Sequence, residues 1–249
     1  MFYKTLQKKI LEVVKNNNLF DKEITIKTRA LKPAEAIGNP DRDDFPLLKG
    51  KEVLMEAEFD SKKGQAYTDA PSEFSGPLQN IANLELKDSR NRALFIAALN
   101  AVMKYLDNEL PTIHCKDNEP EECAGEMINF LQPLIKPGKV GLIGLQPAIL
   151  EALVNFTGSN NVFCVDRDEK NRTNIKFGVT IEWGDDQGME ELFQKTDLIL
   201  STGSTVVNGS LSDIINLAEK YQKPLYFYGT TIAGTAKLMD LKHLCFQST

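Results

Sequence analysis

The sequence predicts an α/β protein, with a small α+β domain followed by a larger domain built on a doubly wound parallel sheet. In the first half, strand patterns precede a long helical pattern, which is typical of segregated α+β structure. From Lys139 onward, short continuous apolar runs alternate with helical segments, which is typical of parallel strands covered on both faces. The chain has 249 residues, and 42% of them are hydrophobic, which is enough for two modest cores.

The first half is predicted to contain two helices and three strands. Apolar residues recur at helical spacing near the start, and β-branched residues alternate with polar ones soon after. The expected elements are a helix over 2–17, strands over 23–30, 51–59 and 64–68, and a helix over 90–106 capped by Ser89. Residues 107–116 lack periodicity and read as a linker, so we predict domains over 1–110 and 111–249.

The second half begins with a helix that Asn118 is predicted to cap and that ends near Pro137. The alternating pattern follows it and should give parallel neighbours in one sheet. The expected strands span 139–143, 161–165, 179–182, 197–201, 224–228 and 243–246. The expected helices span 147–156, 190–194, 211–221 and 233–238.

Charge and hydropathy exclude several classes of function. The net charge of −6 argues against a general nucleic-acid or anionic-membrane binder, since both require a positive surface. The first residues do not resemble a signal peptide, and the most apolar long segment is too short and polar to span a bilayer. We therefore expect a cytoplasmic protein with a small-molecule or metal-complex ligand and neither nucleic acid nor membrane as partner. Homo-oligomerisation stays open.

The four cysteines suggest two different roles. Cys164 and Cys245 lie in apolar strand-like runs, which predicts buried free thiols in the sheet. His114, Cys115 and Cys123 lie in a polar region and offer ligands for zinc or another soft metal. Their spacing differs from that of compact zinc motifs, so a linker with incidental thiols is the competing interpretation.

Three turns that follow predicted strands are rich in glycine and hydroxyl residues. In open parallel sheets ligands bind beyond the carboxyl ends of the strands, and free N–H groups at the following helix favour anionic or polar groups. The first turn contains Gly144, the third contains Thr230, and the second runs from Ser201 to Ser210. The candidate ligand-binding residues of the second turn are Thr202, Gly203, Thr205, Asn208 and Gly209.

Each of these turns also has a purely structural interpretation. The glycines can serve tight strand-to-helix turns, and Asn208 or Ser210 can cap the next helix. Asp166 follows the second predicted strand, where dinucleotide-binding folds place the acid that accepts a ribose hydroxyl, but its neighbours also suit a solvated turn. The length of the polar run from 201 to 210 exceeds what capping requires, which favours a binding loop.

The stretches Lys139-Val-Gly-Leu-Ile-Gly and Asp197-Leu-Ile-Leu-Ser-Thr-Gly-Ser-Thr-Val-Val-Asn-Gly-Ser-Leu resemble the "putative heavy-metal chelation" proteins, a domain of unknown function. The Gly229-Thr-Thr-Ile-Ala-Gly turn is similar to their closing loop. The first half, through Gly76-Pro-Leu-Gln-Asn-Ile-Ala-Asn-Leu and Asn91 to Leu106, resembles the enolase N-terminal-like domain that precedes it. The sequence departs from the family pattern at Leu145-Gln-Pro, where aromatic or His-like residues are more usual.

The resemblance implies a Rossmann-like second domain and a binding loop made of the second turn, with Asn100 facing a cleft between the domains. It implies no particular reaction. The first hypothesis is a binding protein for a metal complex or a metallophore-like or nucleotide-like molecule in that cleft, with a transition metal or a nucleotide-type molecule as ligand. The alternative is a transferase using S-adenosylmethionine or NAD, with Asp166 on the ribose. The third hypothesis is a structural or partner-binding protein whose ligand site has decayed.

Overall fold

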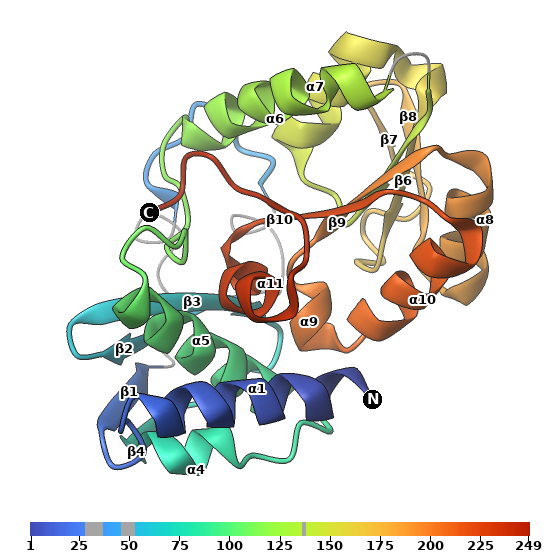
Figure 1. Ribbon diagram of the computed structural model, residues 1–249. Coiled ribbons are helices and arrows are strands. Elements are labelled where there is room, and N and C mark those ends of the chain that lie inside the picture. Colours follow the sequence, from blue (N-terminus) through green and yellow to red (C-terminus); the bar gives the residue numbers. More distant parts are fainter. Residues whose placement is uncertain (28–36, 46–52, 136–137) are drawn as a thin grey trace.

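The computed structural model describes residues 1–27, 37–45, 53–135 and 138–249. These residues form a four-stranded antiparallel sheet and a seven-stranded, mainly parallel sheet, and helices pack on both. Figure 1 shows the antiparallel sheet and the first helices at one end of the molecule and the parallel sheet at the other. The predicted fold class is confirmed. In the described part of the chain, no helix is both long and apolar enough to cross a membrane.

The antiparallel sheet has the strand order β3-β2-β1-β4. Its bounds are β1 (Glu23–Lys27), β2 (Val53–Phe59), β3 (Lys62–Thr68) and β4 (Phe74–Pro77). In β1, buried Ile24 and Ile26 alternate with more exposed neighbours, as the sequence pattern predicts. The sequence did not predict β4, because its glycine and proline weaken the strand pattern. The outer parts of two predicted strands, 28–30 and 51–52, lie outside the described residues.

The helices of the first half are α1 (Phe2–Asn16), α4 (Leu78–Ala82) and α5 (Ser89–Leu106). The cap of α5 is Asp88, one residue before the predicted Ser89. The carboxylate of Asp88 accepts a hydrogen bond from the backbone N–H of Asn91 at 2.8 Å. A carboxylate at this position also suits the positive end of the helix dipole.

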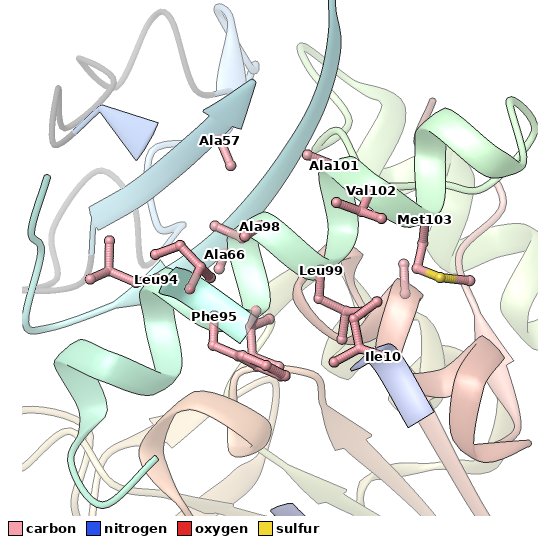
Figure 2. Close-up of a cluster of buried hydrophobic side chains, with 14 of the residues drawn as sticks. Ile10, Ala57, Ala66, Leu94, Phe95, Ala98, Leu99, Ala101, Val102 and Met103 are labelled. Carbon is pink, nitrogen blue, oxygen red and sulfur yellow. The ribbon is translucent and has the colours of Figure 1, made fainter. Parts of the chain in front are cut away.

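α5 is buried on nearly all sides from Arg92 to Met103, because it lies between the antiparallel sheet and elements of the second half. Gly64 of β3 allows the strand and helix to approach closely, since a Cβ there would lie 2.1 Å from the backbone nitrogen of Ala101. Figure 2 shows the apolar side chains of α5 within this core, together with Ala66 of the sheet and Ile10 of α1.

The parallel sheet has the strand order β11-β10-β9-β5-β6-β8-β7, with only the edge strand β7 antiparallel. Its bounds are β5 (Val140–Ile143), β6 (Val162–Asp166), β7 (Ile175–Lys176), β8 (Val179–Trp183), β9 (Leu198–Thr202), β10 (Leu225–Tyr228) and β11 (His243–Leu244). The predicted parallel strands are confirmed as neighbours in one sheet. Their order reverses between β5 and β9, which is the switch point of a doubly wound fold.

Helices cover both faces of this sheet. Their bounds are α6 (Glu119–Ile135), α7 (Pro147–Thr157), α8 (Asp186–Lys195), α9 (Thr205–Asn208), α10 (Leu211–Tyr221) and α11 (Ala233–Met239), with short 3-10 helices η1 (Ser159–Asn161) and η2 (Thr230–Ile232). α6 and α7 share one apolar cluster with one face of the sheet, and α8 and α10 share another with the opposite face. α9, η2 and α11 pack instead against α5, which joins the two parts of the molecule.

The segment 37–45 crosses to the parallel-sheet part. The Arg42 guanidinium binds the carboxylates of Asp44 at 2.7 Å and Glu151 of α7 at 2.9 Å, and it lies over the rings of Phe45 and Phe177. These contacts desolvate Arg42, which by itself lowers the guanidinium pKa, but the two carboxylates more than offset this and raise it. The segment therefore holds the two parts together, while the predicted division at residue 110 stays a prediction.

Three local predictions need correction. Asn118 does not cap α6 through its side chain, because its amide is bound by Asp41, with Nδ2 donating to the carboxylate at 2.8 Å. The helix predicted over 190–194 is longer and begins at Asp186, where the Asp185 side chain caps it. The last strand ends at Leu244, so the half-buried Cys245 lies in the C-terminal tail and not in the sheet. Cys164 is a buried free thiol in β6, as predicted.

Candidate ligand site at the carboxyl end of the parallel sheet

The first and second polar turns meet at the switch point between β5 and β9. Gly144 follows β5 with φ of +86°, a conformation that glycine adopts without strain. A Cβ at Gly144 would lie only 2.6 Å from Cγ2 of Thr202, the last residue of β9. The hydroxyl of Tyr228, at the end of β10, donates a hydrogen bond to the carbonyl oxygen of Gly144 at 2.7 Å. The structure thus brings Gly144 and Thr202 together, and it adds Tyr228, which the sequence did not single out.

Hydroxyl groups of the second turn bond chiefly within the turn. Oγ1 of Thr202 lies 3.1 Å from Oγ of Ser204, and the buried Thr205 hydroxyl donates to the carbonyl of Thr202 at 2.8 Å. Gly203 is buried, and a Cβ there would lie 2.9 Å from Ile232 of η2. Thr205 and Gly203 therefore shape the turn and its packing, whereas Thr202 and Ser204 remain half-buried and close to the switch point.

Asp166, at the end of β6, is tied to the first turn. One carboxylate oxygen accepts the backbone N–H of Leu145 at 2.6 Å. The other accepts the backbone N–H of Asp168 at 2.8 Å and Nδ2 of Asn171 at 3.1 Å. A carboxylate has about four lone-pair positions, so three internal donors leave room for one more partner. The position agrees with the expected site, and the present role of Asp166 is to hold the turn after β5.

Asn208 and Gly209 lie at the far end of the second turn, beside the start of α5. Asn208 is exposed at the end of α9, and its Oδ1 accepts hydrogen bonds from the backbone and hydroxyl of Ser210 at 3.0 and 2.8 Å. Gly209, with φ of +97°, lies against the guanidinium of Arg92, whose Nε donates to the carbonyl of Val207 at 2.6 Å. The turn therefore extends from the switch point to the first turn of α5.

Asn100 and Thr230 belong to the contact between the two parts of the molecule. Nδ2 of the fully buried Asn100 lies within hydrogen-bond distance of three carbonyls, those of Gln65, Thr230 and Thr231, at 2.8 to 3.2 Å. Its Oδ1 accepts the backbone N–H of Gly234 at 2.8 Å. Both the donor and the acceptor group of this amide therefore bond between β3, η2 and α11. The buried hydroxyl of Thr230 has no hydrogen-bond partner among the described residues.

A hollow of about 500 Å³ opens beyond the end of β8. Its lining residues are Arg167, Trp183, Gly184, Asp185, Asp186 and Gln187. The backbone N–H of Gly184 donates to the carbonyl of Asp166 at 2.9 Å, so the hollow adjoins the candidate site. The sequence pattern did not point to these residues. A signal was present, because the single tryptophan of the chain, Trp183, is the last residue of a strand.

The predicted metal ligands are neighbours, but they are not assembled as a ligand set. Within the described ranges, no group of three or more His, Cys, Asp or Glu residues is arranged to hold a metal ion. Nδ1 of His114 lies 2.5 Å from the carbonyl of Cys115, and burial lowers the pKa of His114 to about 4. Burial raises the pKa of Cys115 to about 12. The hydrogen bond with Cys245 lowers the pKa of Cys123 to about 6, despite burial.

The strand order and the polar turns define a Rossmann-like α/β domain joined to an antiparallel α+β unit. The model of the DUF364 family, described as "putative heavy-metal chelation", matches residues 126–237. The resemblance to this family predicted from the sequence is confirmed over these residues.

One solved structure shows the same fold, and a second is similar over part of the chain. A DUF364 protein of unknown function from Pyrococcus horikoshii is 18% identical, with a TM-score of 0.56 over 93% of this chain and 80% of its own. A DUF364 protein from Desulfitobacterium hafniense DCB-2 is 14% identical, with a TM-score of 0.49 over 75% of this chain and 72% of its own. The search of curated proteins found no match.

Proposed function

We propose that this chain binds a small polar ligand, either a metal complex or a nucleotide-like molecule, over the carboxyl ends of its parallel strands. The observation that carries the proposal is the reversal of strand order between β5 and β9, with Gly144 and Thr202 in contact at that point. Loops on the two sides of a switch point turn in opposite directions, which leaves a place for a ligand between them. The family description, which names heavy-metal chelation, supports a metal complex as one of the two ligand classes.

Polar groups near this point suit an anionic or hydroxyl-bearing ligand. The half-buried hydroxyls of Thr202 and Ser204 can each donate and accept, and the start of α7 directs its helix dipole towards the same edge. The hollow at the end of β8 adds an aromatic surface from Trp183 beside Asp166. Asn208, whose Oδ1 binds Ser210, offers its Nδ2 group at the exposed end of the turn.

The proposal is tested by titrating the protein with NAD, S-adenosylmethionine and nickel citrate as probes, using thermal shift and calorimetry. A probe at 100 times its dissociation constant should stabilise the fold by about 2.7 kcal/mol. For the probe that binds, Thr202→Val should weaken binding at least tenfold, because it keeps the side-chain shape and removes the hydroxyl. Thr157→Val is the matched control, since the Thr157 hydroxyl bonds within α7 at its opposite end. Equal affinities of wild type and Thr202→Val for that probe would contradict the proposed location.

The hollow beside Asp166 favours a second candidate, a transferase that uses a nucleotide-type cofactor. Its ribose would take the remaining acceptor position on Asp166, and its base would lie against Trp183. This candidate requires NAD or S-adenosylmethionine to bind and to quench the fluorescence of the single tryptophan. Binding of nickel citrate with no response to either nucleotide would argue against it.

A further inference from the structure

Two cysteines from separate segments, Cys123 and Cys245, meet at the start of α6, and a third, Cys115, lies nearby. Cys115 precedes the helix, Cys123 lies in its second turn, and Cys245 comes from the C-terminal tail. The thiols of Cys123 and Cys245 are hydrogen-bonded to each other, and Cys115 lies near enough to interact electrostatically with this pair. Figure 1 shows the tail returning along the molecule towards this end of α6. None of these cysteines belongs to the candidate ligand site.

Backbone hydrogen bonds fix the tail in this position. The carbonyl of Thr249 accepts the N–H groups of Thr112 and Ile113 at 3.1 and 2.7 Å, and the N–H of Thr249 donates back to Ile113 at 3.3 Å. Within the tail, the N–H of Phe246 donates to Sγ of Cys123 at 3.4 Å. Hydrogen bonds of the C-terminal tail therefore hold Cys245 next to Cys123.

The surroundings of Cys123 favour a thiolate at the start of α6. Sγ of the buried Cys123 receives a backbone N–H, and Sγ of Cys245 lies 2.6 Å from the hydroxyl of Ser248. The Phe246 N–H stabilises the charged form of Cys123, which is the form that binds metals. The hydrogen bond with Cys123 and burial raise the pKa of Cys245, so Cys245 would lose its proton only when a metal ion binds. Since no three metal-binding side chains are arranged together in the described ranges, an ion that requires four protein ligands would not be satisfied here. Monovalent copper is different, because it is soft and two thiolates in a near-linear arrangement are enough for it.

We propose that Cys123 and Cys245 form a two-thiolate binding site for a soft monovalent metal ion, with copper(I) as the representative. On binding, each thiol that becomes a ligand releases its proton, and the ion lies between the two sulfurs without change of oxidation state. Cys115 is not a ligand of this site. The site pins the C-terminal tail to α6, so occupation by metal should stabilise this junction. The inference does not depend on the proposed ligand site, with which it shares no residue.

The test uses the reduced full-length protein, titrated anaerobically with copper(I) in competition with the chromogenic chelator bicinchoninate. We expect one equivalent of copper to be withdrawn from the chelator per chain. Cys123→Ser and Cys245→Ser should each weaken this binding at least a hundredfold. Cys115→Ser and Cys164→Ser are the matched controls and should retain wild-type affinity, since one thiol lies outside the pair and the other is buried in β6. Circular dichroism of each variant establishes that it is folded.

A second measurement needs no substitution. Copper(I) should protect Cys123 of the wild-type protein from alkylation by iodoacetamide, as read by mass spectrometry of its peptides. Failure of the wild-type protein to compete with bicinchoninate, or undiminished affinity in a folded Cys123→Ser variant, would overturn the proposal. An equal loss of affinity in Cys115→Ser would also overturn it, because the site would then need three thiols. None of these results depends on NAD, S-adenosylmethionine or nickel citrate binding at the sheet edge.

Discussion

Replacing Asn100 with alanine should strongly destabilise the protein, because its amide joins the two parts of the molecule. The change leaves the buried N–H of Gly234 and three carbonyls without their shared partner. An unsatisfied buried polar group costs about 1–3 kcal/mol, and relaxation of the backbone should limit the sum to about 3–5 kcal/mol. Since domains of this kind are stable by about 5–15 kcal/mol, the variant should still fold at low temperature.

The free energy of unfolding can be measured by urea denaturation followed by circular dichroism. Asn83→Ala is the matched control, because Asn83 is exposed and its amide donates to one carbonyl, that of Gln79; it should cost less than about 1 kcal/mol. Asn100→Asp keeps the acceptor for Gly234 but turns an oxygen towards three carbonyls, so it should cost at least as much as alanine at neutral pH. A cost below about 1 kcal/mol for Asn100→Ala would refute the assignment of Asn100 as the fully bonded link between the two parts.

Three further changes test other parts of the structure. Gly144→Ala should cost about 1–3 kcal/mol more than Gly158→Ala in urea unfolding, because both positions have positive φ but only Gly144 would collide with Thr202; equal costs would contradict this packing. Arg42→Met should lower the free energy of unfolding by about 1–3 kcal/mol, and 1 M salt should weaken the difference. Burial raises the pKa of Tyr3 to about 12, so its contribution is complete below pH 10 and is lost as the pH rises through 12; Tyr3→Phe should flatten the difference in stability between pH 9 and 11, as measured by urea unfolding at each pH.

The strands of the second half could be predicted from the sequence because each is a continuous run of apolar residues. A parallel strand covered on both faces must be apolar throughout, as in Val140–Ile143 and Leu198–Thr202, and such runs are recognisable without knowledge of their neighbours. The strand order could not be predicted, since it depends on contacts between distant segments. Cys245 illustrates the limit: its local sequence resembles a strand, but the pairing of β11 with β10 ends at Leu244.

The places of the polar turns could be predicted from the sequence, but the bonding of their side chains could not. Glycine and hydroxyl residues after strands predict the edge where a ligand can approach, and this remains a prediction. The structure shows that two of these turns meet, with Gly144 beside Thr202. The sequence does not show which polar group already has a partner. The amide of Asn100 is bound entirely within the chain, Oδ1 of Asn208 holds Ser210, and the Asp166 carboxylate receives three donors. These bonds join residues from different elements, so only the folded arrangement reveals them.

Contacts of the second turn also connect the switch point to the junction between the two parts of the molecule. Gly203, next to Thr202, packs against Ile232 of η2, and η2 also carries two of the carbonyls that Asn100 holds. Tyr228 connects β10 to the carbonyl of Gly144 from the other side of the turn. A ligand that displaced Thr202 or Tyr228 would therefore act on the surface where α5 is held. In this arrangement the turn after β9 is connected to α5 through η2, so a movement at the switch point would be transmitted to the packing of α5 against the antiparallel sheet.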